Sequence, residues 1–230
     1  MHILKALVST FVLTFCSTAF GQMPKDLYCP EADWDWGEVG IDFDIYHVYK
    51  LINGSSKPIK LDSVVAPCDC SWVKISDSSL APGDTCLATL KFSTKDFYGR
   101  TTKVVEAHWK DPRPRSIVMS YSATVGQFFG AVKPEPVSVF LVQGQTSRKL
   151  SVTNPKLARI ELAGVEMYGD FAEIKTIKGE AAMGNRIELE VTARNSLKAG
   201  TYAGNARLTI AVEGEKRPLL ITIPIKIARY

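Results

Sequence analysis

Short segments of alternating apolar and polar residues run through most of the chain, and the last of them shows the pattern most clearly. Between residues 219 and 227 an apolar side chain occupies every second position, and Thr222, Pro224 and Lys226 lie among the positions between. A period of two is typical of a β-strand with one buried face and one wet face. Pro224 cannot donate to a strand ladder, which indicates an edge strand or a bulge.

Comparable segments rich in Val, Ile, Tyr, Phe and Thr recur about every 8 to 15 residues, separated by Gly, Pro, Asn, Asp or Ser. Helix signals are nearly absent. This pattern favours antiparallel sandwiches with Greek-key connections.

The same order of features occurs twice. Residues 51–54 (Leu-Ile-Asn-Gly) match residues 152–155 (Val-Thr-Asn-Pro), and Gly99 matches Gly200 at the same offset of 101 positions. That spacing is too long for a solenoid unit and is typical of two copies of one domain.

We therefore predict an all-β chain in which a cleaved signal peptide (residues 1–21) precedes two tandem immunoglobulin-like antiparallel β-sandwich domains, residues 22–126 and 127–230. The joining segment, Gly126 to Lys133, is short and partly apolar, so we expect the domains to pack together. Tyr202 begins a late strand just after a Gly turn. It is either a tyrosine corner, with its hydroxyl bonded to upstream backbone, or an ordinary strand aromatic.

The first 21 residues predict export. Lys5 precedes an apolar stretch, Ala6 to Phe15, and small residues follow up to Gly21, as in a secretory signal. The stretch is about half the length that a membrane-spanning helix needs. Cys16 could carry a lipid, but the bulky Phe15 before it does not suit a lipoprotein cleavage site. We expect a periplasmic or secreted protein that begins near Gln22.

Charge and motifs exclude several classes of function. The formal net charge is +4 and falls to +3 once Lys5 is removed, which is too weak and dispersed to predict nucleic-acid binding. No later apolar run is long enough for an integral membrane segment. Nucleotide-binding glycine loops, nucleophile elbows and His-Glu-x-x-His are all missing. We therefore predict no catalytic residue and no cofactor.

Four cysteines remain after signal removal: Cys29, Cys68, Cys70 and Cys86. In an oxidising compartment an even number predicts disulfides. A bond from Cys68 or Cys70 to Cys86 would close a loop of about 15 to 20 residues and stabilise the fold by roughly 3 kcal/mol. We prefer that pairing, with Cys29 taking the remaining cysteine. A direct Cys68–Cys70 bond is possible but would close a tight ring.

The alternative is thiol chemistry. The Cys-Asp-Cys segment could present two thiolates on one side, and Cys86 could complete a Cu(I) or Zn site with Cys68 and Cys70, or the pair could exchange electrons with a redox partner. His47 and His108 are distant in sequence, and no Cys-x-x-Cys pair is present.

Two loops are candidates for partner contact: Asp69 and Trp72 beside the cysteines, and Arg113 and Arg115 in a basic, proline-rich hairpin.

An acidic cluster between residues 31 and 44 lacks the spacing of a calcium loop. Aromatic and branched residues interleave it, so we interpret it as a first strand with a wet acidic face.

A family resemblance appears in the first half of the chain. Trp36-Gly37-Glu38-Val39, the segment from Ala66 to Ser71, Ala81-Pro82-Gly83-Asp84 and Gly99 together resemble the bacterial "domain of unknown function 1573" family over about residues 33–125. The resemblance implies an immunoglobulin-like fold in an exported protein and no established activity. Asp69 stands where the family usually has Gly, and Ser71 where it usually has Thr.

These observations predict a non-enzymatic module of the cell envelope that binds an unknown envelope or secreted protein. Two other functions remain open: thiol-dependent Cu/Zn binding or redox exchange at Cys68 and Cys70, and a chaperone-like role for a two-domain sandwich that pairs strands with its client.

Overall fold

The computed structural model describes residues 26–66, 68–111 and 113–230. The predicted signal peptide, with Cys16, lies outside these residues. Within the described ranges no helix combines the length and the hydrophobicity needed to cross a bilayer.

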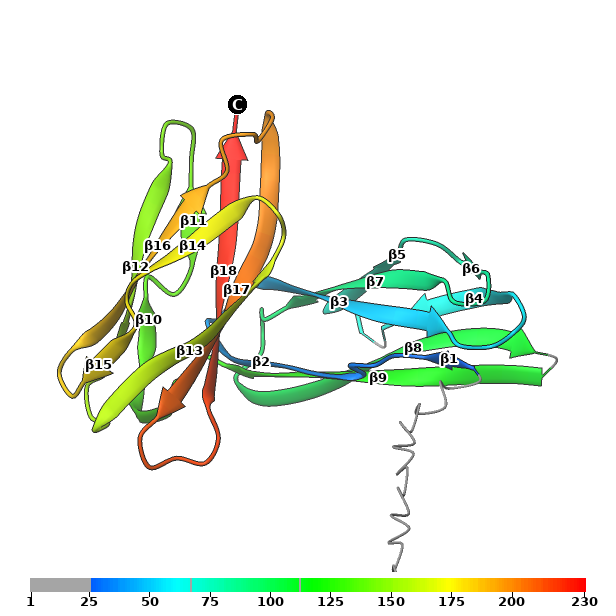
Figure 1. The fold of residues 1–230 in the computed structure, drawn as a ribbon, viewed down its shortest axis with the longest axis horizontal. Coiled ribbons are helices and arrows are strands. Elements are labelled where there is room, and N and C mark those ends of the chain that lie inside the picture. The colour runs from blue at the N-terminus through cyan, green and yellow to red at the C-terminus, as the bar shows by residue number, and fades with distance from the viewer. Residues whose placement is uncertain (1–25, 67, 112) are drawn as a thin grey trace, which may run out of the picture.

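Strands dominate the chain, and the prediction of an all-β fold is confirmed (Figure 1). The first half contains β1 (Leu27–Tyr28), β2 (Asp33–Val39), β3 (Asp44–Asn53), β4 (Ile59–Val65), β5 (Ser71–Ile75), β6 (Ser79–Leu80), β7 (Thr85–Ser93), β8 (Gly99–Asp111) and β9 (Arg113–Val125). After a short 3₁₀ turn, η1 (Phe129–Ala131), the second half contains β10 (Lys133–Glu135), β11 (Val139–Leu141), β12 (Ser147–Thr153), β13 (Arg159–Tyr168), β14 (Ala172–Lys178), β15 (Glu180–Ala182), β16 (Arg186–Ala193), β17 (Gly200–Val212) and β18 (Leu219–Arg229).

The buried apolar side chains form two separate clusters. One draws its members from Leu27 to Val125 and the other from Val132 to Ile227, so the division falls inside the predicted joining segment. We call residues 26–125 the N-terminal unit and residues 132–230 the C-terminal unit. This division is consistent with the predicted two-domain organisation.

Each unit has two layers of strands around its core. The four-stranded sheets are β1-β3-β7-β5 and β10-β12-β16-β14. The opposing layers are joined into one sheet of order β15-β13-β17-β18-β2-β9-β8-β4-β6, because β18 pairs with β2 across the two units. The β18–β2, β2–β9 and β11–β18 pairs are parallel and the others antiparallel, which corrects the purely antiparallel prediction. Figure 1 shows the two sandwiches crossing where β2 meets β18.

Pro224 lies neither on an edge strand nor at a bulge, contrary to the prediction, because the β17–β18 register runs through it without a shift. The strand β18 pairs with β17 along one side, and along its other side with β2 at Ile221 and with β11 from Ile225 onward. Pro224 occupies the interval between these two partners, where β18 pairs only with β17. Proline is tolerated there because the second side of the ladder is interrupted.

The internal repeat is confirmed in three dimensions by two buried asparagines, Asn53 and Asn154, both with no exposed surface. Each side-chain amide donates to two backbone carbonyls: those of Lys57 (2.8 Å) and Leu80 (2.9 Å) from Asn53, and those of Leu157 (2.9 Å) and Ala181 (3.1 Å) from Asn154. Leu80 and Ala181 are again 101 positions apart. An asparagine side chain therefore stabilises the equivalent turn in each unit by the same kind of hydrogen bonds.

The tyrosine corner is also confirmed. The Tyr202 hydroxyl donates a hydrogen bond to the carbonyl of Lys198, 3.1 Å away and four residues upstream. The bond fastens the start of β17 to the turn before it.

Candidate functional site

The structure joins Cys68 to Cys70 in a disulfide and leaves Cys29 and Cys86 as free thiols, so the preferred pairing with Cys86 is wrong. The reason is the strand order. Cys70 lies just before β5, where its carbonyl accepts a hydrogen bond from Ser93 at the end of β7, and Cys86 lies near the start of β7. Cys86 and Ser93 are seven strand positions apart, which corresponds to about 23 Å.

Cys86 is fully buried in the N-terminal core, where β7 places it opposite Leu51 of β3. It therefore cannot complete a metal site with Cys68 and Cys70. Among residues 26–66, 68–111 and 113–230 no three His, Cys, Asp or Glu side chains converge as metal ligands would. Cys29 forms no disulfide with Cys68 or Cys70 either. It is half-buried, and burial raises the pKa of its thiol, which keeps it protonated at neutral pH.

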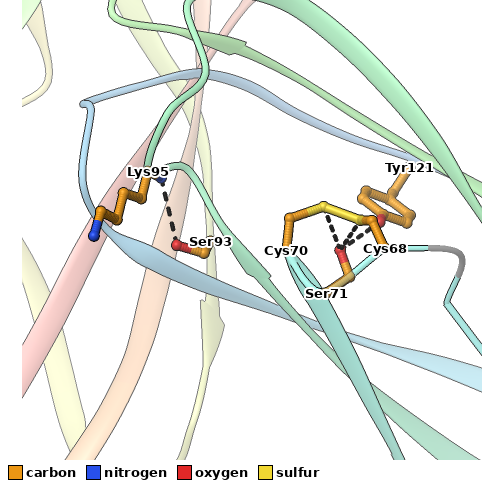
Figure 2. The surroundings of a disulfide bond; sticks show 6 residues. All are labelled: Cys68, Cys70, Ser71, Ser93, Lys95 and Tyr121. Carbon is orange, nitrogen blue, oxygen red and sulfur yellow. Dashed lines mark hydrogen bonds between the residues drawn. A yellow bond between two sulfur atoms is a disulfide. The ribbon is translucent and has the colours of Figure 1, made fainter.

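A pair of hydroxyl groups lies against the disulfide (Figure 2). The Ser71 Oγ atom is 3.8 Å from the Cys68 sulfur and 3.7 Å from the Cys70 sulfur, and it shares a hydrogen bond of 2.5 Å with the Tyr121 hydroxyl. Burial raises the pKa of Tyr121, although the bond to Ser71 lowers it in part, so the phenol stays protonated. A protonated Tyr121 can donate to Ser71, which leaves the serine hydrogen free to point at sulfur.

Two adjoining clefts lie beside this loop. The smaller, about 430 Å³, is lined by Asp69, Cys70 and Trp72 together with Tyr46 and Ser93. The larger, about 640 Å³, is also lined by Tyr46 and Ser93 and continues to residues of the C-terminal unit, which are Ser138, Val139, Phe140, Thr201, Ala203, Pro224, Ile225 and Lys226. We call the two clefts together the inter-unit groove.

Each cleft of the inter-unit groove is lined by an exposed large apolar side chain. Trp72, on β5, is 52% exposed and Phe140, on β11, is 44% exposed. Their neighbours carry both signs of charge: Asp42 and Asp69 are exposed, and the Lys226 ammonium lies 6.0 Å from the centre of the Phe140 ring. The predicted contact residues Asp69 and Trp72 therefore share one cleft.

Arg113 and Arg115, the other predicted contact residues, lie elsewhere. They belong to β9, close to the tip of the β8–β9 hairpin, and Arg113 precedes Tyr121 by eight strand positions, or about 26 Å. Arg115 forms an ion pair with Asp26 and lies over the Trp109 ring. The two predicted contact loops thus do not form one surface.

The segment Trp36-Gly37-Glu38 connects the two units, a role that sequence reasoning missed. Trp36 is fully buried in the N-terminal core, and its carbonyl accepts a hydrogen bond of 2.6 Å from the Thr222 hydroxyl of β18. Gly37 has a φ of +69°, and a Cβ atom there would lie 2.1 Å from the Leu220 carbonyl oxygen. Glu38 then pairs with Ile221. The only advance signal was an unexplained glycine inside a strand, which often marks a close backbone approach.

Aromatic and charged side chains reinforce the same junction. Trp34 stacks on His47 with 3.8 Å between ring centres, and the Arg207 guanidinium of β17 lies 3.6 Å from the centre of the Trp34 ring. Arg207 also donates to the Asp35 carbonyl (2.8 Å) and to both carboxylate oxygens of Glu166. Burial, with a smaller contribution from Arg207, lowers the pKa of His47 to about 3. The imidazole is therefore neutral and does not repel the guanidinium.

The acidic cluster of β2 is distributed among separate contacts. Asp35 forms a bidentate ion pair with Arg100, and Asp33 accepts a hydrogen bond from the Ser120 hydroxyl. Glu38 accepts a hydrogen bond of 2.8 Å from the backbone N–H of Phe129 in the joining segment. Each of these carboxylates therefore has its own partner, and they do not form a shared acidic site.

We expect Glu38 to make stability depend on pH. Burial raises its pKa from 4.5 to about 7, despite the opposing hydrogen bond from Phe129. Between these values the folded chain holds more protons than the unfolded chain, so the free energy of unfolding falls as pH rises from about 4.5 to 7. Glu38→Gln should flatten this decline, as measured by urea unfolding at pH 5 and pH 8. An unchanged pH dependence in the variant would show that Glu38 is not the group responsible.

Comparison with solved structures finds matches at low sequence identity. A protein of unknown function from Porphyromonas gingivalis is 12% identical, with 86% of this chain and 98% of that chain covered and a TM-score of 0.35. The Escherichia coli chaperone DraB is 11% identical, with 86% and 95% covered and a TM-score of 0.35. A PapD-like domain of human CEP192 is 9% identical, with 56% and 99% covered and a TM-score of 0.37.

No curated protein matches the chain in sequence. Residues 28–125, which make up nearly all of the N-terminal unit, match the family described as "Protein of unknown function (DUF1573)". The Trp36-Gly37-Glu38 junction and the Cys68–Cys70 loop both lie within the match. The resemblance of the first half of the chain to the domain of unknown function 1573 family is thereby confirmed.

Proposed function

We propose that this protein is an exported, non-enzymatic module, periplasmic or secreted, that binds another envelope or secreted protein in the inter-unit groove. The observation that carries the proposal is the pair of exposed aromatic side chains, Trp72 and Phe140, one in each cleft of that groove. Exposed aromatic residues beside a cleft are the usual anchors of protein interfaces.

The free edge of β5 supports binding of an extended segment. β5 is the last strand of the sheet β1-β3-β7-β5, so one side of Ser71–Ile75 carries unpaired backbone groups. Trp72 and Lys74 of this strand are exposed. A partner strand could pair with this edge while Trp72 packs on its side chains.

The contacts between the two units support a groove that exists before the partner arrives. The β2–β18 pairing and the contacts of Arg207 hold Tyr46 of one unit close to the other, and the Tyr46 ring stacks on Tyr168 with 5.3 Å between ring centres. A preformed groove lowers the entropic cost of binding.

The test is affinity capture from native envelope extract with the tagged chain, quantified by mass spectrometry. We expect Trp72→Ala and Phe140→Ala each to reduce capture of the same partner about thirtyfold, because truncating an aromatic anchor typically costs about 2 kcal/mol or more. Tyr98→Ala is the matched control, since Tyr98 is 72% exposed but lines neither cleft. Equal capture by both groove variants and the wild type would refute this binding surface.

A further inference from the structure

We propose that the Cys68–Cys70 disulfide is a thiol–disulfide exchange site that accepts two electrons from a dithiol of a partner protein. This activity goes beyond binding and does not depend on the inter-unit groove holding a protein. The two sulfurs are joined across a single residue, Asp69, and both cysteines are partly exposed.

The position of the bond argues against a structural staple. It links no two strands, because both cysteines belong to the turn between β4 and β5. In the chain-entropy account the stabilisation from a disulfide grows with the length of the loop it closes, and this loop is minimal. Cys29 and Cys86, which could have tied β1 or β7 to other strands, are free thiols.

The smaller cleft reaches the disulfide from the Cys70 side. Cys70 lines the smaller cleft, whereas Cys68 is not among its lining residues. Exchange requires an incoming thiolate to approach along the line of the S–S bond. The cleft therefore favours attack on Cys70, with Cys68 as the leaving group.

The Ser71 and Tyr121 hydroxyls are placed to stabilise the thiolate that leaves. Ser71 Oγ lies within 3.8 Å of both sulfurs, and Tyr121 can donate to it in turn (Figure 2). Charge near the cleft is mixed. Lys91 lines the cleft and attracts a thiolate but is paired with Asp44 at 3.3 Å, and the Asp69 carboxylate opposes the approach.

The reaction balances as two exchange steps. A partner thiolate attacks Cys70 Sγ, the Cys68–Cys70 bond breaks, and its electron pair leaves on Cys68 Sγ, which water then protonates. The second partner thiolate attacks the partner sulfur of the mixed disulfide and displaces Cys70 as a thiolate. Cys68 and Cys70 are reduced to two thiols, and the partner dithiol is oxidised to a disulfide.

The experiment uses the oxidised mature chain with dithiothreitol as the dithiol and with glutathione as the monothiol. Reduction is followed by alkylation and mass spectrometry of the peptide that contains both cysteines. We expect reduction while circular dichroism shows the chain still folded, and a glutathione mixed disulfide on Cys70 in a Cys68→Ser variant exposed to oxidised glutathione.

The hydroxyl contribution is tested separately. Ser71→Ala should slow reduction about tenfold, because a hydrogen bond to a charged sulfur is lost. Ser71→Thr, which keeps the hydroxyl, should restore the rate. Ser93→Ala is the matched control, since Ser93 lines the same cleft but its hydroxyl accepts a hydrogen bond from Lys95 rather than contacting the sulfurs.

Two results would overturn the proposal. One is reduction that occurs only once the chain unfolds in urea, which would make the bond structural. The other is equal rates for the wild type, Ser71→Ala and Ser93→Ala, which would remove the role of the hydroxyl pair. Because small thiols are the probes, neither result bears on partner binding in the groove.

Discussion

Replacing Asn154 by Ala is expected to lower the free energy of unfolding of the C-terminal unit by about 3 kcal/mol, since each buried polar group left unpaired costs about 1 to 3 kcal/mol. The variant leaves the carbonyls of Leu157 and Ala181 without their donor and the Leu157 N–H without its acceptor. Asn154 is completely buried, so water does not replace these bonds without rearrangement of the turn.

Hydrogen exchange measured by mass spectrometry would locate the loss. All four tryptophans lie in the N-terminal unit, so their fluorescence during urea unfolding reports chiefly on that unit, although the Trp34 ring also contacts Arg207 of the C-terminal unit. We expect faster exchange in β12 and β16 of Asn154→Ala with little change in the tryptophan transition. Asn195→Ala, at an exposed turn position of the same unit, is the control. A comparable effect in both variants would contradict the role assigned to Asn154.

Gly37→Ala is expected to separate β2 from β18 and destabilise the junction by about 3 kcal/mol. Alanine is strained at a φ of +69°, at a cost of about 1 to 3 kcal/mol, and its Cβ would overlap the Leu220 carbonyl oxygen. The two cores do not depend on this contact, because each is formed from residues of its own unit. We therefore expect a change in the arrangement of the units with both still folded.

Small-angle X-ray scattering would detect that change as a larger radius of gyration, and hydrogen exchange should rise around Ile221. Gly83→Ala is a matched control, because Gly83 has a similar φ of +84° but nothing lies within 4 Å of an added Cβ. Gly83→Ala therefore introduces the same backbone strain as Gly37→Ala but no steric overlap. If both variants scatter like the wild type, Gly37 does not hold the junction.

Much of the fold could be predicted from local pattern. Alternation of apolar residues identified the strands, and the repeat of Asn53 at Asn154 indicated two equivalent turns. The position of Tyr202 after Gly200 indicated the corner whose hydrogen bond to Lys198 the structure contains. These features depend on interactions within a strand or a turn, which neighbouring residues specify.

The candidate site was less predictable. Asp69 and Trp72 were identified beside the cysteines, but Tyr46, Ser93 and Phe140, which complete the inter-unit groove, were not. They come from three different strands of two units. No spacing in the sequence indicates that β3, β7 and β11 meet at one place.

The sequence by itself determined the strands, the repeat of 101 positions and the presence of a Cys-Asp-Cys turn. Only the tertiary structure decided which sulfurs are bonded, because that depends on which ends of β5 and β7 are adjacent. It also decided that Trp36-Gly37-Glu38 joins two units into one sheet. Sequence patterns report which side of a strand is buried, whereas contacts between distant strands are set by how the layers pack.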